Sequence, residues 1–326
     1  MGSCALILEP KARNSKRGFK LIYFNRNCNL CGSADCRQVY RVLDFSIVKC
    51  TACHFIYLNP APIDTPVDIY GESYFRGRER DTDAYNVKGW DYLEPDHLRD
   101  VEEQSRRRMN AIESFVTGGR ILDVGCGMGI FLKEASSRMW EAYGVDVSPF
   151  AVHYARETLA LRNVRVLDVK SLDFMDGSMD AVTMFHLIEH VLYPKELVDS
   201  CHRILRPGGI LVVETPDISS GRARRQGINW RFIKIPEHVN YFSLKLLSQL
   251  LRERGFTILE TVKNVESTGI INKLCGGERE ARIFYDTWAG KACFRFIVNQ
   301  VRKAKEFVSG NLLKNYDHVL VLARKN

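Results

Sequence analysis

From residue 119 onward, short apolar runs alternate with segments whose apolar positions recur every three or four residues. Short continuous runs predict buried strands, and a period near 3.6 predicts amphipathic helices. The expected strands are 120–124, 143–146, 164–167, 181–185, 210–214, 256–262 and 318–323, and the expected helices are 128–138, 149–161, 187–191, 195–205 and 242–254. Strands that alternate with helices predict an α/β protein whose parallel sheet is covered on both faces.

The first 118 residues lack this alternation. Residues 1–20 are expected to form a loose arm, and residues 21–60 hold closely spaced cysteines among short β-like runs. Residues 61–118 are polar and aromatic and predict a linker or lid that ends in a helix over 95–115. The chain is therefore expected to carry a small cysteine module, a connecting segment and one α/β domain over 119–326.

The α/β domain has an expected insertion at about 265–316, because the last two strands are farther apart than a hairpin needs. Within it, residues 292–308 place phenylalanines on one face and lysines and arginines on the other. Such a segment could cover a substrate pocket, lie on a membrane surface or pack on the core as an ordinary basic helix.

Composition is ordinary for a globular protein, with 45% apolar and 26% charged residues. The sequence contains no run of about 18 apolar residues, so no transmembrane helix is expected. The N-terminus lacks the charged and then apolar layout of a secretory signal. We therefore expect a cytoplasmic location.

The net charge is +8, and it is concentrated in residues 219–326, which carry 20 basic and 9 acidic side chains. A positive field of this kind favours an anionic partner such as a phosphorylated small molecule, nucleic acid or a membrane surface, unless it is only a solvated face. The side chains expected to help bind an anionic substrate are Arg222, Arg224, Arg225, Trp230, Arg231 and Lys234.

A glycine loop follows the first strand of the α/β domain. Residues 123–129 read D-V-G-C-G-M-G, and Asp146 ends the next strand, 21 residues after Gly125. Glycines let a backbone approach a ligand closely, and a carboxylate at the end of the second strand can accept hydrogen bonds from both ribose hydroxyls. The spacing G-x-G-x-G departs from the nicotinamide pattern G-x-G-x-x-G. The combination indicates a nucleoside-containing cofactor at the carboxyl ends of the strands.

The loop also carries a family resemblance. Residues 121–129, I-L-D-V-G-C-G-M-G, resemble the first motif of class I S-adenosylmethionine (SAM)-dependent methyltransferases. Other stretches resemble this family in the same order, with a departure at Asp173 where many relatives carry Pro; they are 166–169, 176–182, 186–191 and 205–209. Residues 186–191, H-L-I-E-H-V, are similar to a stretch of the small-molecule methyltransferases, including the quinone O-methyltransferases. The resemblance spans about residues 119–262.

This resemblance implies a doubly wound, seven-stranded, mostly parallel sheet of the Rossmann-like methyltransferase type, with the last strand antiparallel. It also implies SAM as the cofactor. By resemblance the glycine loop surrounds the methionine part, Asp146 holds the ribose, Asp168 and Val169 meet the adenine, and Phe185 and His186 line the sulfonium side. The alternative hypotheses give these residues only structural roles, in which Asp146 caps a helix and Asp168 belongs to a turn. The expected cofactor-binding residues are Asp123, Gly125, Cys126, Gly127, Gly129, Asp146, Val147, Asp168, Val169, Phe185 and His186.

Two C-x2-C pairs, Cys28–Cys31 and Cys50–Cys53, are separated by 18 residues. This spacing predicts a four-cysteine zinc site, and four thiolates leave no open position, so the zinc is expected to be structural. Either Cys36 or His54 could replace one of the four ligands. The alternative hypothesis is that the four cysteines are reduced and bind no metal. The module resembles zinc ribbons that precede the methyltransferase domain in bacterial sugar- and polysaccharide-tailoring enzymes; some ribosomal-RNA base methyltransferases carry a similar module.

Methyl transfer to a hydroxyl needs aligned reactants and a base that removes the proton. His190 is the first candidate base, with Glu189 as its orienter or as a second base, and His238 is the second candidate. Each histidine could instead be bonded to the backbone or packed in a loop.

The favoured function is SAM-dependent methylation of a small, anionic molecule, a sugar or sugar nucleotide of polysaccharide or natural-product biosynthesis. An RNA methyltransferase that uses the ribbon and the basic last third is the alternative, although no Asn-Pro-Pro-Tyr-like motif follows the fourth strand. A quinone or lipid O-methyltransferase and a non-catalytic scaffold are the remaining readings.

Overall fold

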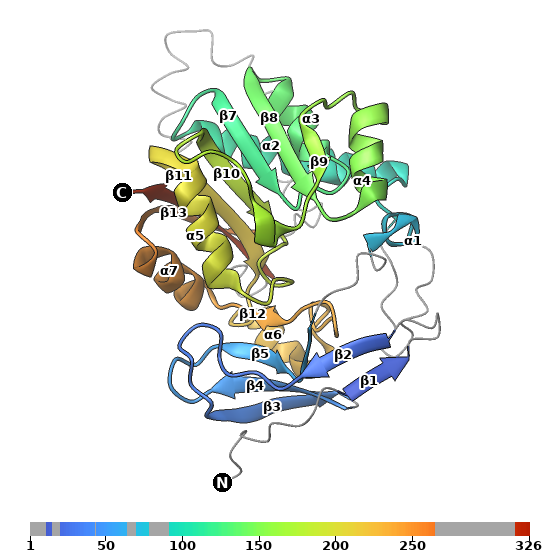
Figure 1. The fold of residues 1–326 in the computed structure, drawn as a ribbon, viewed down its shortest axis with the longest axis vertical. Coiled ribbons are helices and arrows are strands. Elements are labelled where there is room, and N and C mark those ends of the chain that lie inside the picture. The colour runs from blue at the N-terminus through green and yellow to red at the C-terminus, as the bar shows by residue number, and fades with distance from the viewer. Residues whose placement is uncertain (1–10, 15–19, 43, 64–69, 78–90, 265–316) are drawn as a thin grey trace, which may run out of the picture.

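The computed structural model describes residues 11–14, 20–42, 44–63, 70–77, 91–264 and 317–326. The insertion expected at 265–316, with its amphipathic segment, lies outside these ranges, as does most of the N-terminal arm. Figure 1 shows a large lobe built on one sheet and a smaller β lobe formed mainly by the N-terminal part of the chain. Among the described helices, none combines the length and apolarity that crossing a membrane requires.

The strands of the large lobe are β7 (Gly119–Val124), β8 (Trp140–Asp146), β9 (Val164–Val166), β10 (Met179–Phe185), β11 (Leu205–Pro216), β13 (Phe256–Asn264) and β14 (His318–Lys325). They lie in the order β13-β14-β11-β10-β7-β8-β9. Strands β7 to β11 pair in parallel, and β14 runs antiparallel to both β11 and β13. The predicted seven-stranded, mostly parallel sheet with an antiparallel last strand is confirmed.

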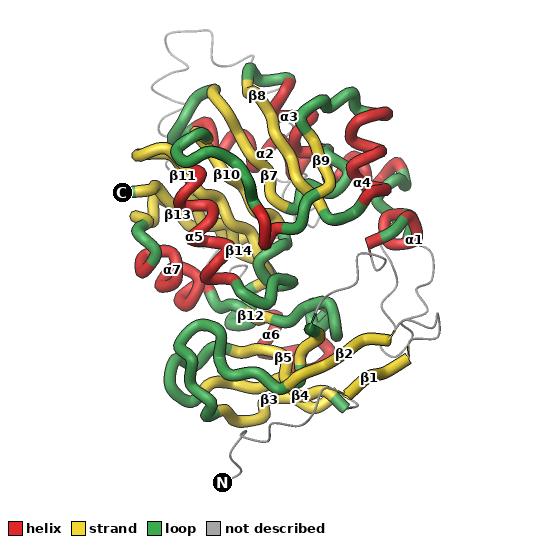
Figure 2. The backbone as a smooth tube through the Cα atoms, in the orientation of Figure 1, coloured by secondary structure: helices red, strands yellow, loops and turns green. Residues whose placement is uncertain are grey.

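Helices cover both faces of this sheet (Figure 2). They are α2 (Pro95–Glu113), α3 (Ile130–Ser136), α4 (Pro149–His153), α5 (Pro194–Ile204) and α7 (Leu244–Glu253). Because neighbouring strand residues point to opposite faces, Leu122 packs in the core beneath α5 and α7, whereas Ile121 packs in the core beneath α2, α3 and α4. Because each face of the sheet packs in an apolar core, successive strand residues face one core or the other, which explains the continuous apolar runs in the sequence.

One predicted helix is wrong. Residues 187–191 form a turn, entered by His186 in the left-handed region with φ of +52°. The carbonyl of Glu189 accepts hydrogen bonds from the backbone amides of Val239 and Asn240. In a helix this carbonyl would instead accept a hydrogen bond from an amide four residues later. The helix expected over 149–161 ends as α4 at His153 and continues as a π-helical turn, Tyr154–Thr158.

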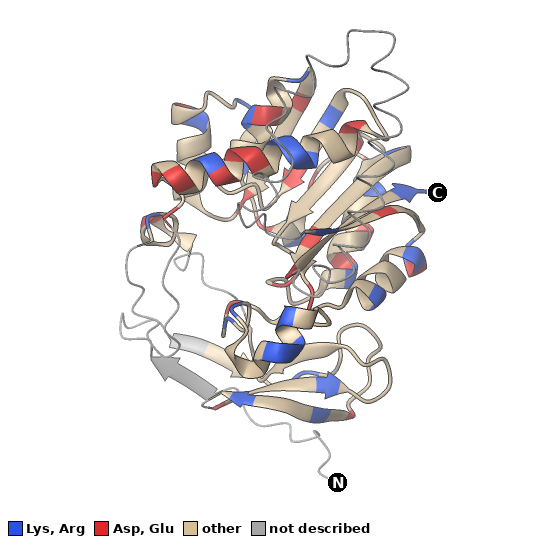
Figure 3. Ribbon diagram, turned by 180° about the vertical axis from the view of Figure 1, so that it is seen from behind, with Lys and Arg blue, Asp and Glu red and all other residues tan. Residues whose placement is uncertain are grey.

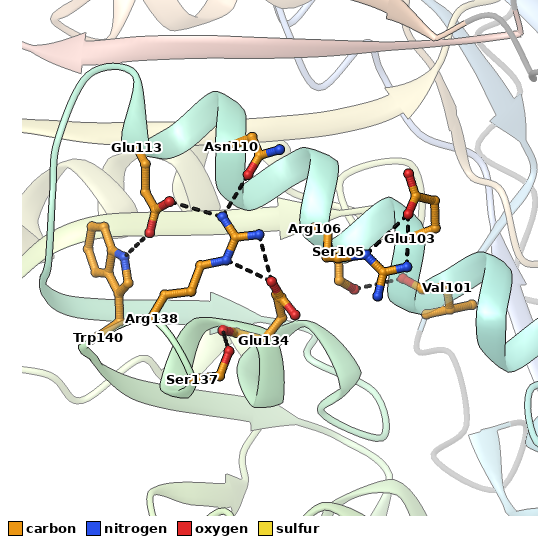
Figure 4. Close-up of polar contacts among 10 residues, drawn as sticks. All are labelled: Val101, Glu103, Ser105, Arg106, Asn110, Glu113, Glu134, Ser137, Arg138 and Trp140. Carbon is orange, nitrogen blue, oxygen red and sulfur yellow. Dashed lines mark hydrogen bonds and ion pairs between the residues drawn. The ribbon is translucent and has the colours of Figure 1, made fainter. Parts of the chain in front are cut away.

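Helix α2 lies in the segment expected to be a linker or lid, and it packs on the large lobe. Met109 and Ile112 are fully buried against the sheet. Figure 4 shows the polar side of this contact, where the Arg138 guanidinium reaches Glu113 at 3.0 Å and Glu134 at 2.7 Å, and the Trp140 indole donates to Glu113. These contacts hold α2 against α3 and the start of β8.

The small lobe contains two sheets. Strands β1 (Lys11–Asn14), β2 (Lys20–Phe24) and β6 (Ala61–Pro62) form one, and β3 (Cys36–Val42), β4 (Phe45–Cys50), β5 (Ile56–Asn59) and β12 (Asn240–Tyr241) form the other. Strand β12 comes from the large lobe's part of the chain and pairs antiparallel with β5. Figure 1 shows β12 and α6 (Gly221–Gln226) between the two lobes. The four-stranded sheet is therefore completed by residues distant in sequence.

Candidate functional site

The glycine loop folds back on the end of β8. The backbone amides of Gly125 and Cys126 donate to the carbonyl of Val145 at 2.8 and 3.0 Å. Gly129 has a φ of +79°, and a Cβ there would lie 2.7 Å from Leu161 and 3.1 Å from Ala155. Glycine is favoured here because the backbone is in the left-handed region and a Cβ would crowd Leu161 and Ala155.

Asp146 meets the glycine loop, as the sequence predicts. One carboxylate oxygen accepts the Gly127 amide at 2.8 Å, and the other accepts the Ser148 amide at 2.8 Å. Burial raises the pKa of Asp146, while these amides oppose the rise. Each carboxylate oxygen can accept more than one hydrogen bond, so the group is held in place by the backbone and still has capacity for ligand hydroxyls.

Other residues expected around the cofactor make contacts of their own. The Asp123 carboxylate accepts the Thr183 hydroxyl at 2.7 Å, and burial raises its pKa to about 7. Asp168 is exposed and accepts the Lys170 amide at 2.9 Å, which caps a 3-10 turn over Val169–Ser171. This contact agrees with the alternative hypothesis that Asp168 is a turn residue. A contact between Asp168 and the adenine stays a prediction. Cys126, Val147 and Val169 also lie at these strand ends.

Phe185 and His186 leave β10 in different directions. The Phe185 ring packs on Phe131, with ring centroids 4.8 Å apart, and the Arg108 guanidinium lies 4.1 Å above it. His186 places Nδ1 3.3 Å from a Glu189 carboxylate oxygen and Nε2 3.8 Å from Glu214. Their expected roles beside the sulfonium stay predictions.

The three candidate catalytic residues lie together. The rings of His190 and His238 are 4.7 Å apart, centroid to centroid, and the Tyr70 hydroxyl lies 3.3 Å from His190 Nδ1. Burial lowers the pKa of both histidines, and that of His238 falls well below its ordinary value. Both imidazoles are therefore neutral near pH 7, the form in which a histidine accepts a proton.

Glu189 is placed differently from the expectation that it orients His190. Its carboxylate accepts the Thr215 hydroxyl at 2.9 Å and lies beside His186. Burial acts to raise the pKa of Glu189, but the contacts with His186 and the charge of His190 together lower it below its ordinary value. Glu189 thus supports His186, and Tyr70 is the side chain that contacts the His190 ring nitrogen.

Sequence reasoning missed Tyr70 and a buried centre around Glu214. The Glu214 carboxylate accepts from Arg108 Nε at 2.7 Å and lies 3.5 Å from His318 Nε2. Burial alone would raise the pKa of Glu214, but Arg108, with His186 and His318, lowers it to about 2. Glu214 does stand at a strand end, and Tyr70 lies in an aromatic stretch, which were the available signals. No local pattern connects residue 70 or 108 with this edge of the sheet.

The cysteines of the two C-x2-C pairs meet in one cluster. All four sulfur atoms lie within 4.8 Å of one another, with Cys28 3.4 Å from Cys53 and Cys31 3.5 Å from Cys50. Four sulfurs on a tetrahedral zinc ion stand about 3.8 Å apart. The first sulfur of each pair accepts hydrogen bonds from the backbone amides two and three residues later, which are Leu30 and Cys31 for Cys28 and Ala52 and Cys53 for Cys50. Two equivalent turns that aim four sulfurs at one point fit a zinc ion.

Two further groups bring together side chains of metal-binding types, namely His186, Glu214 and His318, and Glu189, His190 and His238. In the first, Arg108 already neutralises Glu214 at 2.7 Å, which opposes a second cation. In the second, Glu189 is engaged by Thr215 and His186. Arg108 thus pairs with Glu214, whereas Thr215 satisfies one oxygen of Glu189 and the other oxygen has His186 Nδ1 3.3 Å away but no hydrogen bond.

Part of the basic set converges on one carboxylate. Asp317, which is 2% exposed, accepts from Arg222 at 2.6 Å and from the Trp230 indole at 2.9 Å, and Arg231 lies 3.2 Å away. Two arginines and the Trp230 indole therefore meet at the Asp317 carboxylate, and Figure 3 shows the basic residues of α6 in blue. The expectation that these side chains contact an anionic substrate stays a prediction.

The chain matches known proteins over this lobe. A family model described as a methyltransferase domain matches residues 97–261. The "Probable S-adenosylmethionine-dependent methyltransferase" of Mycolicibacterium smegmatis is 28% identical over 154 residues, 47% of this chain and 58% of that protein. The ubiquinone biosynthesis O-methyltransferase of Xanthomonas campestris pv. campestris is 33% identical over 165 residues, 48% of this chain and 66% of its own length.

A SAM-dependent methyltransferase structure from Archaeoglobus fulgidus aligns with 70% of this chain and 94% of its own, at 21% identity and a TM-score of 0.47. This chain covers 58% of the length of the Mycolicibacterium relative and 66% of the length of the Xanthomonas relative.

Proposed function

Because this chain belongs to the methyltransferase domain family, we propose that it transfers a methyl group from SAM to a small anionic molecule. The observation that carries the proposal is the convergence at one sheet edge. There the Gly127 amide donates to Asp146 at 2.8 Å, and the His190 and His238 rings meet edge to face with centroids 4.7 Å apart. One side offers a fixed carboxylate for a nucleoside sugar, and the other offers neutral bases.

SAM, when bound, would supply a methyl group that its positively charged sulfur makes electrophilic, and S-adenosylhomocysteine would leave as a neutral thioether. Asp146 is the residue that would hold the ribose, because the backbone already fixes its carboxylate. Phe75 lies 3.8 Å from where a Gly127 Cβ would stand, so α1 (Glu72–Phe75) borders the loop. These residues would orient the donor, and alignment of donor and acceptor supplies much of the rate enhancement in such reactions.

A hydroxyl acceptor must also lose its proton. His190 is neutral and has the Tyr70 hydroxyl at Nδ1, so Nε2 can receive the proton when Tyr70 accepts from Nδ1–H. His238 is the second candidate, but the larger lowering of its pKa makes it the weaker base. In this proposal His190 takes the proton and His238 positions the acceptor or His190.

A sugar or sugar nucleotide is the acceptor we favour. The cysteine module resembles those of sugar-tailoring methyltransferases, and the basic last third suits a phosphorylated acceptor. A quinol is the second candidate, favoured by the name of the Xanthomonas relative. RNA is the third, because the small lobe exposes Arg37 and Arg41 on β3. A membrane contact would involve 292–308, outside the described residues.

We also propose that Cys28, Cys31, Cys50 and Cys53 hold a structural zinc ion. Burial raises the pKa of Cys28 to about 11, so four adjacent thiolates require a cation to stay ionised together. Full coordination by protein sulfur gives this ion no catalytic position. Reduced cysteines of this kind fit a cytoplasmic location.

The test uses SAM with a labelled methyl group, offered with nucleotide sugars, quinols and RNA in separate reactions. Label should enter the nucleotide sugars and depend on His190. Label in a quinol or in RNA would replace the favoured acceptor with that alternative. Calorimetry with SAM and S-adenosylhomocysteine tests the family function independently of the acceptor, and no binding of either would overturn it.

A further inference from the structure

The small lobe reaches the two histidines through one buried arginine. Arg26 lies two residues before Cys28, the first cysteine of the two C-x2-C pairs, and is 7% exposed. Its guanidinium donates to the carbonyls of Leu58 at 3.3 Å, Leu192 at 3.3 Å and Val239 at 2.6 Å, and to the Asn240 side-chain oxygen at 3.0 Å. Leu192 follows His190 by two residues, and Val239 directly follows His238. One side chain thus joins the cysteine module to both histidine-bearing segments.

These two segments are also fastened to each other. The Asn240 amide group donates to the carbonyls of Ile188 at 3.3 Å and Val191 at 2.6 Å. The Val239 and Asn240 backbone amides both donate to the carbonyl of Glu189. Arg26 therefore closes a frame in which the His190 turn and the His238 segment have a fixed relative position.

The first cysteine turn makes independent contacts with the same frame. The Asn29 side chain donates to the carbonyl of Leu192, and Lys195 Nζ donates to the carbonyl of Leu30 at 3.2 Å. Cys28, Cys50 and Phe55 share a hydrophobic core with α5 and α7, and the Phe55 and Phe242 rings are 5.0 Å apart. Among the described residues, the apolar side chains of the cysteine module pack in clusters that it shares with the large lobe, which ties the module to the site.

We propose that Arg26 is a positioning residue that sets the spacing of His190 and His238, so that the four-cysteine module supports the acceptor half of the site. The inference rests on the proposed function only in giving the histidines a catalytic role. Arginine suits this position because its fork reaches several carbonyls at once, whereas lysine offers donors from a single point. Its acceptors among the described residues are neutral oxygens, so its contribution is geometric rather than a direct ion pair.

The test compares the full-length chain with Arg26→Met, Arg26→Lys and the control Arg37→Met. Arg37 is exposed on β3 in the same lobe. Imidazole nitrogen shifts of the 15N-labelled proteins, recorded at one pH with S-adenosylhomocysteine bound, report the environment of each histidine. Zinc content and the Kd for S-adenosylhomocysteine report the cysteine site and the cofactor half.

We expect Arg26→Met to shift the imidazole signals of His190 and His238. The Kd for S-adenosylhomocysteine should stay within about threefold, a change in binding free energy of less than about 0.7 kcal/mol, and zinc should be retained. Arg26→Lys should give a smaller shift, and Arg37→Met none. Unchanged histidine signals in Arg26→Met would overturn the proposal. A loss of cofactor affinity or of folding in both Arg26 variants would also overturn it, because Arg26 would then be a general stabiliser. If the unmodified chain binds no cofactor, the proposed function fails, and the same histidine signals recorded without cofactor still test Arg26.

Discussion

The two halves of the candidate site are built in different ways. The cofactor half is made by a short continuous stretch in which backbone amides of Gly127 and Ser148 hold Asp146. The acceptor half gathers side chains from distant parts of the chain, with Tyr70, His190 and His238 on three separate segments. A site assembled locally tolerates change elsewhere in the molecule, whereas a site assembled from afar depends on every segment that contributes. The two halves should therefore respond differently to substitution.

The largest expected effect is on turnover in the acceptor half. His190→Ala should lower kcat by about 10²–10⁴-fold, the usual contribution of a general base, while the Kd for SAM stays unchanged. His238→Ala should have the smaller effect of the two. Initial rates at saturating SAM and calorimetry check this pair of outcomes. A loss of SAM affinity in His190→Ala would show that the two halves are not separable.

The next effect concerns the buried centre around Glu214. Arg108→Met should lower the free energy of unfolding by about 3–5 kcal/mol, because it leaves Glu214 charged and without its guanidinium partner. Arg107→Met, one residue earlier, removes only an exposed pair with Glu103 and should cost at most about 1 kcal/mol. Denaturant unfolding of both variants measures the difference. Equal losses would show that the Glu214 pair contributes no more than a surface contact.

Cofactor affinity should change by a smaller amount. Asp146→Asn keeps the size of the side chain but removes its charge and one acceptor, so the Kd for SAM should rise by about 10–100-fold, the equivalent of about 1.4–2.7 kcal/mol. Asp168→Asn, at the exposed turn, is the comparison and should change the Kd less. Calorimetry decides the order. A larger effect at Asp168 would move the main nucleoside contact to the third strand.

The smallest effect is the response to acid. The pKa of His190 is lowered by burial, and the groups that act on it are Glu189, Glu237, Lys234 and His186. Protonation removes the base, so activity should fall only below pH 6.5, and at pH 6.5 the loss should be less than about twofold. The same lowered pKa predicts that the stability contributed by neutral His190 is complete above pH 6.5 and declines as the pH falls below it. A pH–rate profile with its midpoint above 6.5 would contradict this assignment.

The cofactor half could be predicted from the sequence because its information is local. The glycine loop, Asp146 and the alternating strands occupy one stretch, and the structure places Asp146 on the loop as expected. The family and the fold are confirmed. The four cysteines were also found from spacing alone, and they cluster; the zinc ion stays a proposal.

The acceptor half was only partly predictable. Glu189, His190 and His238 were identified as candidates and lie together, but the partner of His190 is Tyr70, 120 residues earlier. Likewise, residues 187–191 were predicted as a helix but form a turn, whose Glu189 carbonyl accepts two hydrogen bonds from the amides of Val239 and Asn240. Long-range partners of this kind leave no periodic signal in a single sequence.

Strand β12 has a consequence for how the chain is made. Its two residues, Asn240 and Tyr241, cover the edge of β5, and an uncovered strand edge invites pairing with other chains. On the ribosome, β5 emerges long before residue 240 is synthesised. The nascent small lobe must therefore persist with an open edge through most of translation, and any shortened product that ends before residue 240 keeps that edge as a site for aggregation.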